Sequence, residues 1–145
     1  MPIAQATPPE AHEILRRHPD AVYLDVRTEA EFEAGHPAGA RNVPVLFVDP
    51  ATRQPQPNGD FVAVVERHLP RTTKLVVGCQ MGGRSQRACE LLAAAGFTDL
   101  TNVFGGFGGA RDESGRVVPG WRDAGLPVEQ GTPAGAGYAE LARKR

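Results

Sequence analysis

A cysteine set between glycines is the residue best placed to do chemistry in this chain. Cys79 follows an apolar run at residues 75–77, and four residues separate it from Arg84. Gly78 precedes the cysteine, and Gly82 and Gly83 follow it closely, so the backbone can turn tightly on both sides. The thiolate form of cysteine is a strong nucleophile. The spacing therefore indicates covalent catalysis at Cys79.

The elements on either side position Cys79 at the end of a strand and the start of a helix. Residues 75–77 predict a buried strand, and apolar residues at 88, 91, 92 and 95 recur with helical spacing. In an open α/β sheet this junction is where ligands bind. Free N–H groups and the helix dipole stabilise negative charge there, so we expect Cys79 to be partly deprotonated near neutral pH.

The loop after Cys79 is predicted to hold an anion, because its glycines let successive N–H groups converge. Arg84 either holds that anion or pairs with a buried carboxylate, since an unpaired cation at a helix start opposes the dipole. Ser85 either hydrogen-bonds the sulfur or caps the helix. The predicted binding residues are Gln80, Met81, Gly82, Gly83, Arg84 and Ser85.

Two reaction classes use a cysteine–loop–arginine cradle: phosphoryl transfer and sulfur transfer. Cysteine phosphatases with a similar pattern place one more residue between the cysteine and the arginine. The smaller ring between Cys79 and Arg84 favours one extra sulfur atom on Cys79 over a tetrahedral phosphate.

The loop resembles the active site of the rhodanese family, the sulfurtransferases, through its Cys-x-x-Gly-x-Arg-Ser pattern at residues 79–85. Three further stretches resemble family signatures and follow the same order along the chain. They are Leu24-Asp25-Val26-Arg27 with Glu31-Phe32, then Gly35-His36 with Gly39-Ala40 and Asn42-Val43-Pro44, and finally Gly105-Gly106 with Trp121 and Gly125-Leu126-Pro127-Val128.

This resemblance implies an α/β, three-layer rhodanese-like fold, a parallel five-stranded sheet with helices on both faces. The domain is expected over residues 1–130, followed by a Gly/Pro-rich tail at 131–145. The implied reaction moves a sulfane sulfur from thiosulfate or a persulfide donor to cyanide, a thiol or a protein cysteine, through a Cys79 persulfide and without a cofactor. Gln80 and Met81 are neutral, which leaves the donor open. The alternatives are a small cysteine phosphatase or arsenate reductase, and a non-catalytic sulfur carrier or binding module.

Other residues are given supporting or structural roles. Asp25 and Arg27 lie at the end of a predicted strand on the edge that carries Cys79. They are expected to form a structural ion pair, with Glu31 as a partner for Arg27, or to contact the substrate. Cys89 is predicted to be an inert core cysteine, with a resolving thiol as the alternative. His36 is not expected to act as a general base, because the loop supplies the activation.

Length and composition exclude several other classes. The chain has 145 residues, which suits one domain, and a net charge of -1, which gives no sign of a nucleic-acid partner. No apolar run approaches the ~20 residues that span a bilayer. Two cysteines and four scattered histidines fit neither a disulfide framework nor a metal site. We expect a cytoplasmic protein without membrane contact, whose partners are small-molecule sulfur donors and acceptors and a partner-protein cysteine.

The pattern of apolar residues, caps and turns predicts the remaining elements. Residues 45–60 are expected to form a long irregular loop. Residues 105–120 depart from the rhodanese pattern and predict a surface hairpin or extended turn, with a loop that shapes substrate access as the alternative. Helices are predicted over 7–17, 28–35, 61–69 and from the glycines to about 96, with one turn at 138–141; strands are predicted over 1–6, 21–26, 40–43, 74–78 and 100–104.

Overall fold

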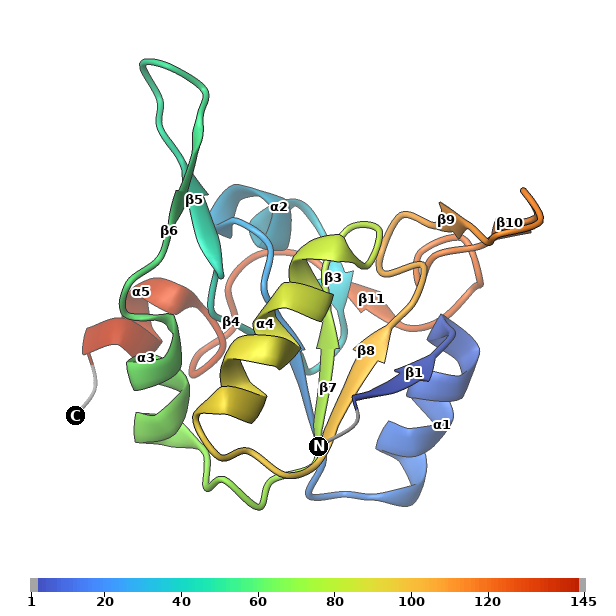
Figure 1. Cartoon of the computed structure of the whole chain (residues 1–145), viewed down its shortest axis with the longest axis horizontal. Coiled ribbons are helices and arrows are strands. Elements are labelled where there is room, and N and C mark those ends of the chain that lie inside the picture. Colours follow the sequence, from blue (N-terminus) through green and yellow to red (C-terminus); the bar gives the residue numbers. More distant parts are fainter. Residues whose placement is uncertain (1–2, 144–145) are drawn as a thin grey trace.

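The computed structural model describes residues 3–143 of the chain, so Met1, Pro2, Lys144 and Arg145 lie outside the description. Its centre is a five-stranded sheet in the order β1-β8-β7-β2-β4, and all four pairings are parallel (Figure 1). This confirms the predicted parallel sheet. The strands are β1 (Ala4–Ala6), β2 (Val22–Asp25), β4 (Arg41–Asn42), β7 (Leu75–Gly78) and β8 (Leu100–Val103).

Helices cover both faces of this sheet and make the three layers that were predicted. Alternate side chains of the central strand β7 divide the core: Leu75 and Val77 pack in one cluster, and Val76 packs in the other. The first cluster is covered by α3 (Phe61–His68), α4 (Gly83–Ala94) and α5 (Tyr138–Arg143), and the second by α1 (Pro8–Arg17) and α2 (Glu29–Ala34). Figure 1 shows α4 in front of the sheet, beside β7.

The start of α2 is a capping box formed by Thr28 and Glu31. The Thr28 hydroxyl accepts a hydrogen bond from the Glu31 amide, and the Glu31 carboxylate accepts one from the Thr28 amide. These bonds satisfy helix-start amides that have no partner within the helix. They also hold the Glu31 side chain in one orientation at the sheet edge.

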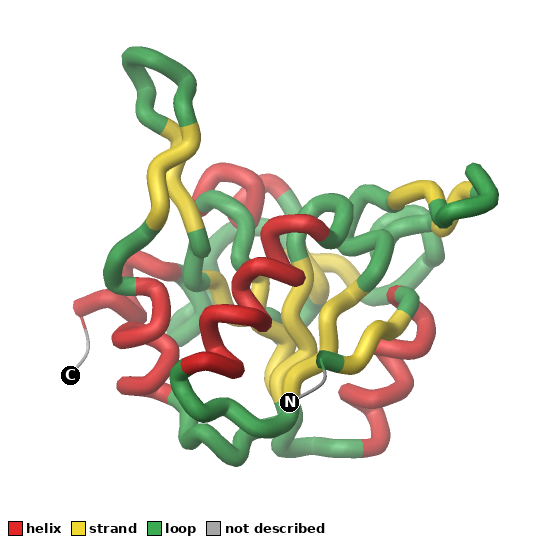
Figure 2. Tube along the Cα trace, in the orientation of Figure 1, coloured by secondary structure: helices red, strands yellow, loops and turns green. Residues whose placement is uncertain are grey.

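The prediction of an irregular loop at residues 45–60 is wrong. This segment contains an antiparallel hairpin of β5 (Leu46–Val48) and β6 (Pro55–Pro57). Figures 1 and 2 show that the hairpin stands away from the body of the domain. Asp49 closes its tip, because its carboxylate accepts bonds from the amides of Ala51 and Thr52. Prolines at both ends of β6 concealed the strand in the sequence.

The segment at residues 105–120 forms the surface hairpin that was predicted. Its strands are β9 (Ala110–Arg111) and β10 (Val117–Val118), paired antiparallel. The turn between them is held by Asp112, whose carboxylate accepts bonds from Ser114 and Arg116. A further small sheet pairs β3 (His36–Pro37) with β11 (Val128–Glu129), which are distant in sequence and were not predicted.

The Gly/Pro-rich segment after residue 130 lies against the domain. The Ala136 carbonyl accepts a hydrogen bond from the Asn42 amide, and Leu141 of α5 is buried in the core beside α3. The Tyr138 hydroxyl contacts the Asn58 amide group at 3.2 Å. Within residues 3–143, none of the helices has the length and apolar character that crossing a membrane requires.

Candidate active site

Cys79 lies between the end of β7 and the start of α4, as predicted, and is 2% exposed. Three donors converge on its sulfur. The Gly82 amide lies 3.1 Å from Sγ, and the Ser85 amide and hydroxyl each lie 3.4 Å from it. Donors arranged in this way, at the positive end of a 12-residue helix, stabilise negative charge on the sulfur.

The segment after β8 holds the loop in this conformation. Three of its backbone amides donate to three successive carbonyls of the loop, at 2.8, 2.8 and 3.0 Å. These bonds direct the three carbonyl oxygens toward the segment after β8, while the amides of Gly82 and Ser85 face Sγ. The pairs are Phe107 to Cys79, Gly108 to Gln80 and Gly105 to Met81.

Two glycines make this close approach possible. Gly106 has φ +52, and a Cβ there would lie 2.3 Å from the Cys79 carbonyl oxygen. A Cβ on Gly108 would lie 2.1 Å from the Gln80 side-chain nitrogen. The sequence contained a signal for this contact, since glycines follow directly after the predicted strand at 100–104. Their role as a brace for the Cys79 loop was not predicted.

Arg84 pairs with a carboxylate, which was one of its two predicted roles. Its guanidinium donates to both oxygens of Glu31, at 2.8 and 3.1 Å. Burial opposes ionisation of Glu31, but the bonds from Arg84 and Thr28 outweigh it and lower the pKa of this carboxyl to about 2. Glu31 is therefore ionised at neutral pH and balances the charge of Arg84.

Asp25 and Arg27 form a buried ion pair with each other, so the predicted pairing of Arg27 with Glu31 is wrong. The Arg27 Nη2 atom lies 2.7 Å from Asp25 and also 2.7 Å from the Gly35 carbonyl oxygen. The Arg27 side chain is 3% exposed and that of Asp25 is 1% exposed. The Arg27 guanidinium lies 4.5 Å from the centre of the Phe107 ring and 3.4 Å from the Gln80 side-chain oxygen. Through the Gln80 contact, the ion pair supports the Cys79 loop.

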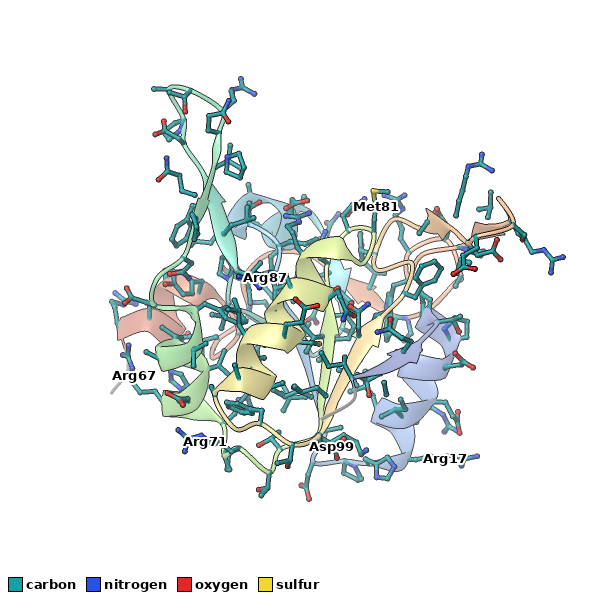
Figure 3. The ribbon with its side chains drawn as sticks, viewed as in Figure 1. Arg17, Arg67, Arg71, Met81, Arg87 and Asp99 are labelled. Atoms are coloured by element: carbon teal, nitrogen blue, oxygen red, sulfur yellow. The ribbon has the colours of Figure 1, made fainter. Side chains whose placement is uncertain are left out.

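Met81 lies at the outer end of the loop and is 61% exposed, and Figure 3 shows it at the outer edge of the domain. Beside the loop lies a cleft of about 660 Å³ between α4, α3 and the β5–β6 hairpin. Its lining is mostly apolar, with two arginines at the α4 side. The lining includes Leu46, Pro57, Phe61, Val62, Arg84 and Arg87.

Cys89 and His36 both have structural surroundings. Cys89 is fully buried in α4, and burial raises the pKa of its thiol to about 12, so it stays protonated. His36 stacks on Phe32 with ring centres 3.6 Å apart, and its two nitrogens contact the Phe32 carbonyl and the Glu129 carboxylate. The burial and raised pKa of Cys89 agree with its predicted inert role, and the contacts of His36 fit a structural role.

Comparison with known proteins assigns the chain to a family. The family model described as Rhodanese-like domain matches residues 7–113. The chain belongs to the rhodanese-like domain family, and its fold is the one that the sequence resemblance implied.

Relatives in this family include named sulfurtransferases. The chain is 37% identical over 107 residues to "Thiosulfate sulfurtransferase 16, chloroplastic" of Arabidopsis thaliana, which covers 74% of this chain and 78% of that protein. It is 38% identical over 85 residues to the Arabidopsis "Protein HIGH ARSENIC CONTENT 1, mitochondrial", covering 59% of this chain and 49% of that protein. The chain spans about half the length of several other relatives.

A solved structure has the same overall arrangement. The crystal structure titled Rv0390 from M. tuberculosis superimposes with a TM-score of 0.73 at 33% identity. The superposition covers 90% of this chain and all of that one. The similarity therefore extends beyond the residues matched by the family model.

Proposed function

We propose that this protein transfers a sulfane sulfur through a persulfide formed on Cys79. The observation that carries the proposal is the convergence of three donors on a buried Sγ, inside a ring with only four residues between Cys79 and Arg84. Such a ring stabilises a small anion on the cysteine. Membership of a family with named thiosulfate sulfurtransferases supports the proposal.

The reaction has two half-steps, each a displacement at sulfur. The Cys79 thiolate attacks the outer sulfur of thiosulfate, the S–S bond of the donor breaks, and sulfite leaves with the electron pair. This forms a persulfide whose negative charge lies on the outer sulfur. An acceptor such as cyanide then attacks the outer sulfur, thiocyanate leaves, and the Cys79 thiolate is restored. Neither half-step requires an external oxidant or reductant.

Loop amides are proposed to hold the outer sulfur, as the sequence predicted for Gln80 to Ser85. The Gly82 and Ser85 amides point at Sγ, and the carbonyls of Cys79, Gln80 and Met81 are tied to residues 105–108. We therefore expect a persulfide sulfur above Sγ to lie near N–H groups and away from these three carbonyl oxygens. This is the electrostatic arrangement that a sulfur anion needs.

The donor and acceptor are proposed from the charges around the loop. Arg84 is balanced by Glu31, and Arg27 is balanced by Asp25, so neither offers a free charge to thiosulfate. A neutral or singly charged persulfide donor fits this environment at least as well as thiosulfate. The cleft beside the loop has room for an acceptor larger than cyanide, such as an organic thiol or a protein cysteine on an exposed segment.

One observation keeps a second candidate in view, namely the relative whose name refers to arsenic. An arsenate reductase or phosphatase on this cradle usually needs an acid near the cysteine. Glu31 is fixed as a carboxylate with a pKa of about 2, and Asp25 is tied to Arg27. Glu31 is therefore a poor proton donor at neutral pH, which favours sulfur transfer, because that reaction needs no general acid here.

Parallel assays test the choice between these reactions. Purified protein is given thiosulfate with cyanide, arsenate with a thiol, or a phosphoester, at equal enzyme concentration. The proposal expects thiocyanate formation and no arsenate reduction or phosphate release above that of Cys79→Ser. Cys79-dependent turnover of arsenate or phosphoester, without sulfur transfer, contradicts it. A protein that only carries sulfur would form the persulfide and discharge it to one protein thiol but not to cyanide.

A further inference from the structure

The Ser85 hydroxyl lies among three acceptors but has one proton to donate. Its Oγ lies 3.4 Å from Cys79 Sγ and 3.1 Å from the Gly82 carbonyl oxygen, and its shortest contact is to Asn102 Oδ1. Ser85 is 0% exposed and Asn102 is 3% exposed, so bulk water does not take part. A donation to one acceptor therefore withdraws the proton from the other two.

A chain of amides fixes which atom Asn102 presents to Ser85. Asn102 Nδ2 donates to Gln5 at 2.9 Å, Gln5 donates to Gln86 at 2.8 Å, and Gln86 donates to the Glu90 carboxylate at 3.4 Å. A carboxylate only accepts, so it sets the direction of each amide back along the chain. The last member, Asn102, is left with its carbonyl oxygen toward Ser85.

The order of the strands brings these residues together. Strand β8 lies between β7 and β1, as Figure 1 shows, so Asn102 on β8 reaches Gln5 on the neighbouring strand. On its other side Asn102 reaches Ser85 in the first turn of α4. The series of hydrogen-bonded amides thus leads from the cysteine loop to the surface of the domain.

The position of the Ser85 proton matters because negative charge leaves Sγ during the proposed reaction. In the free thiolate the charge lies on Sγ, and a donated proton stabilises it. In the persulfide the charge lies on the outer sulfur and Sγ is a neutral sulfide, which is a weak acceptor. Asn102 Oδ1 is then the better acceptor. The change needs only rotation of the Ser85 hydroxyl, so no proton moves between heavy atoms.

We propose that Asn102 is a positioning residue for Cys79, because its Oδ1 atom competes with Sγ for the Ser85 hydroxyl proton. The competition limits how strongly the thiolate is stabilised. A thiolate that is stabilised less is a better nucleophile, because nucleophilicity rises with basicity. This inference rests on the proposed role of Cys79 as the nucleophile.

The test is the pH dependence of Cys79 alkylation by iodoacetamide, followed by intact mass in a Cys89→Ala background. Asn102→Leu removes the nearer of the two competing acceptors at similar side-chain size and leaves the Gly82 carbonyl in place. We expect it to shift the alkylation midpoint down by about 0.5 pH unit, as for one modest hydrogen bond. The same substitution in Ser85→Ala should leave the midpoint where Ser85→Ala alone puts it. An unchanged midpoint in Asn102→Leu, or an equal shift with and without the Ser85 hydroxyl, overturns the proposal.

A surface variant covers the case in which Asn102→Leu does not fold. Gln5 is exposed on β1, so Gln5→Ala should preserve the fold while releasing Asn102 Nδ2. The Asn102 amide can then turn its nitrogen toward Ser85, and the midpoint should again fall, by less than in Asn102→Leu and only when Ser85 is present. No shift in a folded Gln5→Ala protein also contradicts the inference.

Alkylation needs no sulfur donor, so the outcome is separate from that of the proposed function. A shift that depends on Ser85, in a protein that forms no persulfide, retains the role of Asn102 and refutes sulfur transfer. Sulfur transfer without the shift retains the function and refutes the role of Asn102.

Discussion

Arg84 and Glu31 form a bidentate ion pair across the rim of the cysteine loop, with N–O distances of 2.8 and 3.1 Å. The pair connects the first turn of α4 to the first turn of α2. It explains how a cation is accommodated at a helix start, where the dipole opposes it. It also means that the charge felt by a ligand at Cys79 depends on both residues together.

Removing the charge of Glu31 and removing the charge of Arg84 should change the KM for thiosulfate in opposite directions. Glu31→Gln leaves Arg84 unbalanced, so the KM for thiosulfate should fall by about threefold, as expected for a half-exposed charge. Arg84→Gln leaves Glu31 unbalanced, so that KM should rise and the alkylation midpoint of Cys79 should move up. Glutamine at position 31 still suits the capping box.

The double variant is the control for this prediction. With both charges removed, the KM for thiosulfate should return close to the wild-type value, and a neutral persulfide donor should respond little to any of the three variants. Equal effects of both single variants on charged and neutral donors would indicate a steric cause and contradict the electrostatic one.

The same pair predicts a pH dependence of stability. The pKa of Glu31 is about 2 in the folded protein against an ordinary value of 4.5, because the bonds from Arg84 and Thr28 outweigh the cost of its burial. A lowered carboxyl pKa contributes stability above the unfolded value, and this contribution is lost as the pH falls from about 4.5 toward 2. Urea unfolding at a series of pH values measures it.

Glu31→Gln is the reference for that series, because it cannot titrate. The free energy of unfolding of the wild type should exceed that of Glu31→Gln at neutral pH, and the difference should shrink through this acid range. A difference that stays constant with pH would show that the carboxylate is not stabilised by its partners.

The brace after β8 predicts a sharp effect of one methyl group. In Gly106→Ala the new Cβ would lie 2.3 Å from the Cys79 carbonyl oxygen, so the loop must shift and its amides lose alignment. We expect sulfur transfer to fall by about 10²-fold, as for the loss of one well-placed donor. Thiocyanate formation from thiosulfate and cyanide measures this loss.

Gly115→Ala is the matched control for Gly106→Ala. Gly115 also has a positive φ, +83, but nothing lies within 4 Å of the Cβ position. It carries the same kind of backbone strain without a clash at the loop. Similar activity losses in both variants would assign the effect to general destabilisation.

The local sequence predicted the strands of the sheet and the cysteine loop, whereas the parallel arrangement of the strands was predicted from the resemblance to the rhodanese family. Strand β7 is an uninterrupted apolar run, and the glycines beside Cys79 mark the turn into α4. Contacts between distant segments were harder to predict. The partner of Arg27 is its near neighbour Asp25, while Glu31 reaches Arg84, 53 residues away. The sequence is compatible with either Asp25 or Glu31 as the partner of Arg27. The position of α2 beside the loop places Glu31 next to Arg84 instead.

The β5–β6 hairpin shows a second limit. Its strand Pro55–Pro57 has prolines at both ends and no apolar side chain toward the core, so local pattern indicates a loop. Pairing with Leu46–Val48 makes it a strand. The role of Asn102 was hidden for a similar reason, because it depends on strand β1 lying next to β8.

The number of residues between Cys79 and Arg84 is the feature that favours sulfur transfer over phosphoryl transfer. Inserting one glycine between Gly82 and Gly83 would bring the spacing from Cys79 to Arg84 to that of a cysteine phosphatase. The Ser85 amide and hydroxyl would then move away from Sγ, and sulfur transfer should fall by about 10²-fold. Circular dichroism checks that the variant is folded. A folded insertion variant with wild-type transfer rates would return weight to the phosphatase alternative.

Cys79 is proposed to carry the transferred sulfur. The most direct test is the intact mass of the protein after incubation with thiosulfate, and again after cyanide. Wild type and Cys89→Ala should each gain one sulfur atom and lose it to cyanide, while Cys79→Ser should gain none, because Cys89 stays a buried thiol with a pKa of about 12. Addition of sulfur to Cys79→Ser by thiosulfate, or no addition of sulfur to Cys89→Ala, would contradict a Cys79 persulfide.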